Sequence, residues 1–459
     1  MILKPKGYSE NGESMQFLKF INSCLSGCNN ISWNYYKNPW FVKDILDPVS
    51  AKKFIQQIFK NGEKFLPLLI DPSALKFFTD AASLSSSQEI FLHSNPNDQY
   101  SLPDFRATHT ISGFFLGFLI EHCLTGNNTL SVTHPDTFPF SYFWFLTFLY
   151  HDFGYCVSEK EDAPLSLPTN VPGTNHSLTI GIEEYRVLRQ VKNKLNICLS
   201  PFSSIGKTHS CHSAHSPVNE KRTLLQELTQ KSYRIKGSAT LRFNTGTQIH
   251  GCQYTSTVVT RYFNYCAKCL ETLDHGIIGG YLFYDRMIKN YVRAYFSARQ
   301  TAGRQTSLSD FTHKGRHFSE KQLILFSYIA DCIMAHNIWK LPENKRTEYE
   351  KYNLDIALGQ KFKTITFKDN PLLFILAVAD TLEPTKIYGK VTNISAKDVC
   401  EALNIECLPN SHQIVFSSKN KNVDIKYLYS KATSLESWTA VRCSELKDGR
   451  FTLALQPND

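Results

Sequence analysis

A run of apolar and aromatic residues at 140–150, FSYFWFLTFLY, constrains the fold of this chain most strongly. A helix with this pattern is hydrophobic all round and therefore has to lie inside a protein core. The run ends in His151-Asp152, and Gly154 follows. Because an imidazole and a carboxylate are costly to bury without partners, something nearby must satisfy them, and a metal ion would do so.

The chain of 459 residues is long enough to bury a large core and to form about two to four domains. Its apolar runs at 111–120 and 140–150 are shorter than the ~20 residues that a membrane-spanning helix needs. The first residues lack an apolar stretch of signal-peptide length. We therefore expect a cytoplasmic protein with no membrane partner.

Charge and cysteine usage add weaker constraints. The 13 cysteines form no repeating frame, which fits reduced thiols better than a disulfide scaffold. The net charge of +9 fits anionic small molecules or nucleic acid, and equally a basic surface without a partner. Nucleic acid stays open as a partner although no motif supports it, and an oligomer stays open too.

Apolar spacing predicts a mainly α protein. We expect an N-terminal helical region at 1–100, a helical core at 101–155 and 270–390, an insertion at 156–269 that forms a lid or specificity element, and an α+β appendage at 391–459. The predicted helices are 15–24, 51–59, 105–124, 140–150, 180–195, 270–295, 323–339, 371–380 and 396–403. The predicted strands are 239–243, 254–262, 413–417, 423–427 and 451–455.

Metal-competent side chains stand near the ends of several predicted apolar helices. For any one of them, a hydrogen-bonded cap or a satisfied core group is the more common explanation. Six in one chain are harder to explain in that way. The six are His109, His151, Asp152, His275, His336 and Asp380.

The order of these residues, His, His-Asp, His, His, Asp, resembles the HD superfamily of metal-dependent phosphohydrolases. The surrounding words are similar too: RATH at 106–109, YHDFG at 150–154, HGIIGG at 275–280 and AVADTLEPTK at 377–386. The resemblance covers residues 101–155 and 270–390. It implies an HD-domain helical core that the 156–269 insertion interrupts.

The resemblance also implies one or two divalent ions, of Mn, Fe, Mg or Zn. One ion would be held by His109, His151, Asp152 and Asp380, and a second by Asp152, His275 and His336.

The implied reaction is hydrolysis of a phosphoester or phosphoanhydride bond by metal-activated water. The expected substrate is a nucleotide, a nucleotide-derived signal or another phosphorylated small molecule. Asp152 would be central to catalysis as the shared ligand. Arg106, one helical turn before His109, would hold a phosphate, with a surface salt bridge as the equally weighted alternative.

The sequence departs from the superfamily pattern at Tyr155, where many members have a lysine. Arg106, Lys386 or a residue of the insertion would have to replace that phosphate contact, or the substrate class differs. No G-Y-P triplet follows His336, which disfavours the cyclic-di-GMP branch. The long insertion is atypical of the small dinucleoside tetraphosphatase branch.

Two alternatives remain. Either the chain is the enzyme described above, or it is a non-catalytic module that binds metal or nucleotide only to regulate a partner.

The HSCHSAH segment at 209–215 and the CAKC segment at 266–269 suggest a structural zinc site. Incidental histidines in an exposed loop are the favoured explanation.

Overall fold

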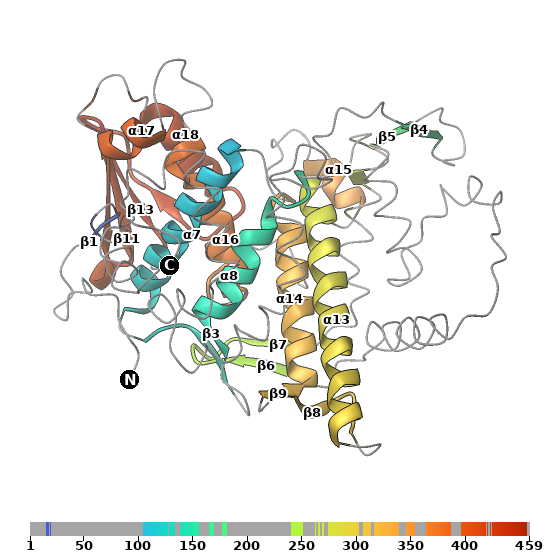
Figure 1. Cartoon of the computed structure of the whole chain (residues 1–459). Coiled ribbons are helices and arrows are strands. Elements are labelled where there is room, and N and C mark those ends of the chain that lie inside the picture. Colours follow the sequence, from blue (N-terminus) through green and yellow to red (C-terminus); the bar gives the residue numbers. More distant parts are fainter. Residues whose placement is uncertain are drawn as a thin grey trace. The chain divides into compact units, whose positions relative to one another are not determined.

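The computed structural model describes the part of the chain that carries most of the predicted helices (Figure 1). Within it, eight α-helices and short antiparallel strands confirm a mainly α fold with a small sheet appendage. The predicted helix at 51–59, nearly all of the helix at 180–195 and most of the strand at 254–262 lie outside the described residues. The described residues are 15–17, 19, 104–126, 128–133, 138–155, 165–168, 177–180, 240–250, 262, 265, 266, 269, 274–302, 306–313, 316–338, 346–352, 354, 364–386, 396–418, 420, 423 and 425–456.

The chain divides into two compact units. Unit 1 consists of Met1–Leu149, Arg242–Gln248 and Thr364–Asp459. Unit 2 consists of Tyr150–Leu241 and Ile249–Lys363. The four regions expected from the sequence, with limits near 100, 156, 270 and 391, stay a prediction.

The helices of unit 1 confirm two predicted apolar runs. Helix α16 begins at Pro371, where the side chain of Asn370 caps it by accepting a hydrogen bond from the backbone N–H of Leu373. Every residue of α16 is buried, as its sequence predicts. The main helices of this unit are α7 (Asp104–Thr125), α8 (Phe140–His151) and α16 (Pro371–Leu382). The part of α8 that belongs to unit 1 ends at Leu149.

Two glycines allow α8 to pack closely on α7. A Cβ atom at Gly113 would lie 2.2 Å from the ring of Phe148, and one at Gly117 would lie 1.9 Å from the ring of Trp144. The indole N–H of Trp144 donates to the backbone carbonyl of Phe114 at 2.9 Å, which satisfies its buried donor.

A five-stranded antiparallel sheet in the order β1-β10-β11-β13-β12 forms the predicted appendage (Figure 1). The predicted strands 413–417 and 451–455 are confirmed, whereas β1 occupies the start of the predicted helix 15–24. The elements are β1 (Met15–Gln16), β10 (Leu403–Leu408), β11 (Gln413–Ser418), β12 (Arg442–Cys443), β13 (Arg450–Ala454), the 3₁₀ turn η7 (Pro409–Ser411), α17 (Ala396–Ala402) and α18 (Ile425–Leu435).

The predicted strand at 423–427 is wrong, because α18 begins at Ile425. Its buried residues, Ile425, Leu428, Ala432 and Leu435, recur every three or four positions, which is the period of a helix and not of a strand. A smaller sheet has the order β3-β2-β6-β7. Its strands are β2 (Ser131–Thr133), β3 (Phe138–Pro139), β6 (Thr240–Phe243) and β7 (Gln248–His250).

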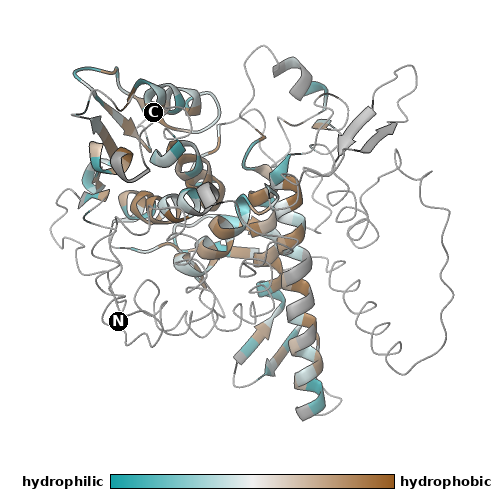
Figure 2. Cartoon of the chain, turned by 45° about the horizontal axis from the view of Figure 1, so that its top comes forward, coloured by the Kyte–Doolittle hydropathy of each residue, from teal (hydrophilic) through white to brown (hydrophobic). Residues whose placement is uncertain are grey.

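Unit 2 is built on a long helical pair, α13 and α14, which lie side by side in Figure 1. Gly280 permits their close approach, since a Cβ atom there would lie 2.9 Å from the carbonyl oxygen of Ala330. The long helix α13 carries both hydrophobic and hydrophilic residues along its length (Figure 2). The elements are α13 (His275–Ala302), α14 (Glu320–Ala335), α15 (Arg346–Lys351), the hairpin β8 (Asp310–His313) and β9 (Arg316–Ser319), and the hairpin β4 (Leu165–Pro168) and β5 (Ser177–Ile180).

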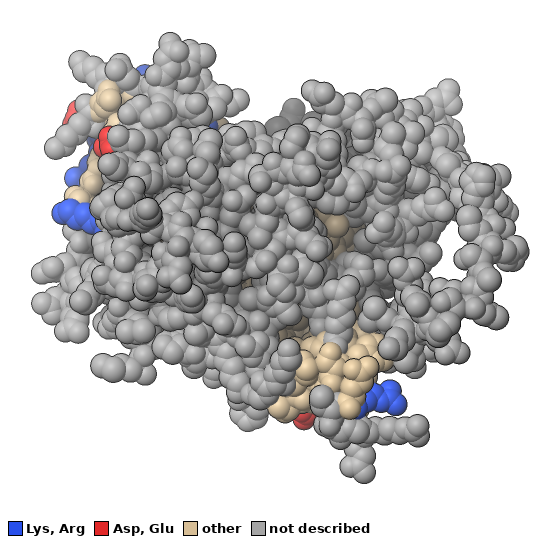
Figure 3. Space-filling view, viewed as in Figure 1, with Lys and Arg blue, Asp and Glu red and all other residues tan. Residues whose placement is uncertain are grey.

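In the described part of the chain, no helix is both long enough and apolar enough to cross a bilayer. On the face shown in Figure 3, the visible side chains of described Lys, Arg, Asp and Glu residues lie at the upper left and at the bottom of the view. Among the described residues, Lys447 and Glu445 form an exposed ion pair of 3.3 Å, of a kind that contributes little to stability.

Candidate metal centre

The end of α8 places two polar side chains in a buried position. His151 is the last residue of the helix, and the turn at 152–154 follows it. His151 is fully buried and Asp152 is nearly so. The turn is tight against α13, because a Cβ atom at Gly154 would lie 1.9 Å from the carbonyl oxygen of His275.

The glycines at the start of α13 serve the same approach. A Cβ atom at Gly279 would lie 2.9 Å from the carbonyl oxygen of Tyr150, and one at Gly276 would lie 2.8 Å from that of Ile333. The backbone of α13 can therefore lie directly against its neighbours in this unit. Close approach of backbone is the physical reason for these glycines.

Unit 2 brings Asp152, His275 and His336 together. One ligand atom of each lies within 4.8 Å of the others. Nε2 of His275 is 3.2 Å from Oδ1 of Asp152, and the rings of His275 and His336 have centroids 5.1 Å apart. Nδ1 of His336 donates to the carbonyl of Ile333 at 2.5 Å, which leaves Nε2 as the acceptor nitrogen that a metal ion requires.

Two residues beside these ligands were not singled out from the sequence. Asn337 has its amide nitrogen 3.1 Å from Nε2 of His336 and 3.3 Å from Nε2 of His275. The same nitrogen lies 3.3 Å from Oδ2 of Asp274, whose Oδ1 accepts from the N–H of Gly276 at 2.7 Å. In the sequence, Asp274 directly precedes His275 and Asn337 directly follows His336. This adjacency to predicted ligands is the only feature of the sequence from which their position at the site could have been predicted.

Tyr155 is the residue at which the sequence departs from the pattern that it resembles. Its ring is stacked on the imidazole of His275, with centroids 3.9 Å apart and planes 20° from parallel. An aromatic surface therefore lies against the ring of a predicted ligand and restricts the plane of that ring.

Unit 1 joins His109 of α7 to Asp380 of α16. Nε2 of His109 is 3.2 Å from Oδ1 of Asp380, and both residues are buried. The other ring nitrogen, Nδ1, lies 2.8 Å from Oε2 of Glu383. The ammonium of Lys386 is 2.6 Å from the same Oδ1 of Asp380. In the sequence, Glu383 was noted only as part of the AVADTLEPTK motif at 377–386, and its contact with His109 was not predicted.

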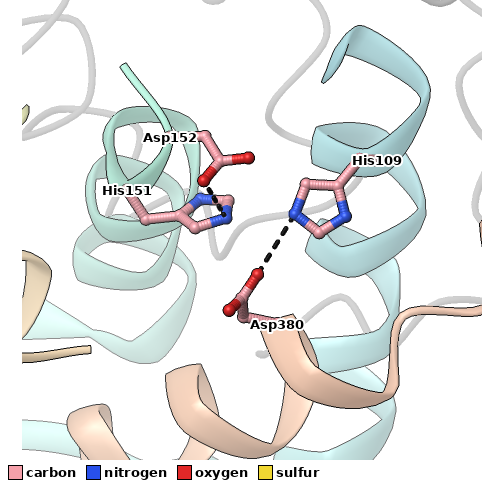
Figure 4. A group of neighbouring side chains, drawn as sticks. All are labelled: His109, His151, Asp152 and Asp380. Carbon is pink, nitrogen blue, oxygen red and sulfur yellow. Dashed lines mark ion pairs between the residues drawn. The ribbon is translucent and has the colours of Figure 1, made fainter. Parts of the chain in front are cut away.

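Figure 4 draws a second group of predicted ligands, with dashed lines for the ion pairs between His109 and Asp380 and between His151 and Asp152. All four residues are buried, and one ligand atom of each lies within 4.8 Å of the others. Asp152 belongs to this group and to the group with His275 and His336. The group in Figure 4 consists of His109, His151, Asp152 and Asp380.

The donor set suits a divalent cation. Imidazole nitrogens and carboxylate oxygens bind Mn, Fe, Zn and, through the carboxylates, Mg. Side chains of these types are costly to bury near one another unless a cation or a set of hydrogen bonds compensates them. These buried His and Asp residues are therefore able to hold a metal ion, as the sequence predicted.

The remaining predicted site residues lie outside this geometry. Arg106 lies on α7 one turn before His109, but its side chain is outside the described residues. The histidines of the alternative zinc site, at 209–215, are also outside them. Cys266 is described and buried; burial, followed by the charge of Asp274, raises the pKa of its thiol well above the usual value.

No protein-family model, no curated protein and no solved structure matches this chain. What the geometry adds to the resemblance is one feature: a buried cluster of His and Asp side chains that is compatible with an HD-like metal site.

Proposed function

We propose that this protein is an HD-type, metal-dependent phosphohydrolase that cleaves a phosphoester or phosphoanhydride bond of a nucleotide or a nucleotide-derived signal. The observation that carries the proposal is the sharing of Asp152 by two groups of ligand atoms, whose residues are buried except for His275, which is partly exposed. A single carboxylate that serves two groups is the arrangement that a two-ion site needs. Divalent ions at such a site supply Lewis-acid polarisation of a phosphoryl oxygen and make water more acidic.

The chain's own residues would divide the remaining work. His109, His151 and Asp380 hold one side of the site, and His275 and His336 hold the other. All of them except the partly exposed His275 are buried, and burial strengthens the charge interactions that they make.

Lys386 supports phosphate binding in place of the missing lysine. Its ammonium lies 2.6 Å from Asp380 and its side chain is 30% exposed, so it borders the site without being sealed in it. An ammonium in this position can donate to a phosphate oxygen of the substrate. Arg106 keeps the same role as a prediction.

The proposal is tested by a nucleotide screen on the protein purified with Mn²⁺, repeated with Asp152→Ala. Asp310→Ala is the matched control, because Asp310 also contacts a histidine, His317 at 2.8 Å, but is 73% exposed on a hairpin. We expect hydrolysis by the wild type and by the control, and a loss of at least about a hundredfold in Asp152→Ala. Activity that survives Asp152→Ala unchanged would rule out this site.

Product analysis then separates the reaction types. Release of triphosphate from a nucleoside triphosphate indicates a triphosphohydrolase. Release of nucleoside phosphates indicates a phosphodiesterase or a dinucleoside polyphosphatase.

A second candidate is a regulatory module that binds metal or nucleotide without turnover. The stacking of Tyr155 on His275, where a lysine is common in the superfamily, favours it. Metal content measured together with turnover discriminates the two, since a regulatory module would be fully loaded with metal and inactive on every nucleotide.

A further inference from the structure

Glu383 has an unusual set of contacts for a carboxylate just after the end of a helix. It follows α16 and is 0% exposed. Its Oε1 accepts from the backbone N–H of Thr385 at 2.8 Å, and its Oε2 accepts from the hydroxyl of Thr385 at 2.5 Å. Oε2 also lies 2.8 Å from Nδ1 of His109. A carboxylate held by Thr385 in this way has one fixed orientation toward the imidazole.

These contacts determine which nitrogen of His109 carries the proton. An ionised carboxylate only accepts hydrogen bonds, so Nδ1 must be the protonated nitrogen. Nε2 then points at Oδ1 of Asp380, 3.2 Å away. Two acceptors that face each other at this distance repel unless a cation or a proton lies between them.

We propose that Glu383 is a positioning residue, which fixes the orientation and the Nδ1-protonated form of His109 so that Nε2 is presented to a divalent ion together with Asp380. The inference rests on the metal site of the proposed function but not on the reaction. A carboxylate behind a metal-binding histidine also raises the basicity of the ligand nitrogen.

The competing explanation is a structural hydrogen bond between α7 and the end of α16, with no bearing on metal. Glu383→Gln separates the two, because it keeps the shape and changes one acceptor into an NH₂ donor. The backbone N–H of Thr385 needs an acceptor at the position of Oε1, so the amide oxygen takes that position. The new NH₂ group then takes the position of Oε2, where it can donate to the hydroxyl of Thr385 and faces Nδ1 of His109. The imidazole proton then moves to Nε2, which can no longer bind a metal.

The experiment is a Co²⁺ titration of metal-stripped full-length protein, followed by the visible absorption of Co²⁺ and by equilibrium dialysis. We expect Glu383→Gln to weaken the affected Co²⁺ site about 10- to 100-fold and to alter its spectrum, at an unchanged thermal unfolding midpoint. Glu121→Gln is the matched control: Glu121 is also buried and lies on α7, but away from the ligands, and its substitution should leave Co²⁺ affinity as in the wild type.

Unchanged Co²⁺ affinity and spectrum in folded Glu383→Gln would overturn the inference, and so would an equal loss in Glu121→Gln. If Glu383→Gln fails to fold, Thr385→Val replaces it, because this change removes only the hydroxyl that orients Oε2. A loss of about threefold or more in Co²⁺ affinity supports the inference, and no loss overturns it.

The titration distinguishes this inference from the proposed function. If the wild type binds Co²⁺ more tightly than Glu383→Gln does but hydrolyses no nucleotide, the role of Glu383 is supported and the enzymatic function is contradicted. If the wild type hydrolyses nucleotides and Glu383→Gln binds Co²⁺ as tightly as the wild type does, the enzymatic function is supported and the role of Glu383 is contradicted.

Discussion

Oδ1 of Asp152 lies 3.2 Å from Nε2 of His275, although the whole 156–269 segment separates the two residues in the sequence. The contact places the second half of the His-Asp dyad against the first residue of α13. Since Asp152 also belongs to the group with His109 and Asp380, its side chain is shared by both candidate ligand groups.

The shared position of Asp152 predicts two kinds of metal loss. Asp152→Asn removes an anionic ligand from both groups, so we expect the bound metal per chain to fall to nearly zero. His336→Asn affects only the group with Asp152 and His275, so about half of the metal should remain. Metal analysis after dialysis measures both values. Equal metal content in the two variants would show that Asp152 is not shared.

Lys386 is predicted to act on substrate more than on metal. Its ammonium borders the site at Asp380, so Lys386→Met should raise KM and lower kcat/KM about 10- to 100-fold, the value of a hydrogen bond to a charged group. Lys386→Arg should recover part of the loss. Lys431→Met is the control, since Lys431 lies over the ring of Tyr427 on α18. A variant that changes only metal affinity would restrict Lys386 to balancing the charge of Asp380.

Much of the helical framework was predictable because it rests on local signals. The run at 140–150 is almost entirely apolar, the run at 371–380 is apolar up to Asp380, and Asn370-Pro371 is a helix start. The strand at 423–427 was mispredicted because alternation in VDIKY is satisfied over a short window, whereas the helical period appears only when Leu428, Ala432 and Leu435 are included.

The residue types of the ligands and their order along the chain could be predicted from the sequence, but the residues that contact the ligands could not. Glu383, Asp274 and Asn337 act through contacts made by the folded chain, and a single sequence contains no pattern for such contacts. His109 and Glu383, for example, meet only because α7 packs against the end of α16. Local sequence therefore indicates what is able to bind a metal, and tertiary packing determines which nitrogen does so.

Gly154 is predicted to be intolerant of a side chain. In Gly154→Ala the new methyl group would lie 1.9 Å from the carbonyl oxygen of His275, so the start of α13 must move. We expect a destabilisation of about 1–3 kcal/mol in urea unfolding, together with weaker Co²⁺ binding by the Asp152, His275 and His336 group. Gly126→Asn is the control, because Gly126 has φ +59° with open space around it and asparagine tolerates this conformation. Wild-type stability in Gly154→Ala would contradict the close approach.

The buried carboxyl of Glu121 is expected to make the free energy of unfolding depend on pH, independently of the metal site. Burial raises the pKa of this carboxyl from 4.5 to about 7, although the N–H of Leu130 and the hydroxyl of Thr125 donate to it. A raised pKa in the folded state means that folding favours the neutral form. The resulting stability is complete below about pH 4.5 and is lost as the pH rises through about 7.

Glu121→Gln should abolish this dependence, because the amide keeps an acceptor for Leu130 and cannot ionise. The variant is expected to be more stable than wild type near pH 8, by up to about 3 kcal/mol, with the difference shrinking toward pH 5. Urea unfolding at both pH values, compared as variant minus wild type, measures this and cancels the titration of other groups. Glu445→Gln, at an exposed ion pair with Lys447, should show no such trend. A Glu121→Gln variant that is less stable than wild type at pH 8 would mean that the ionised carboxylate is the form that the fold requires.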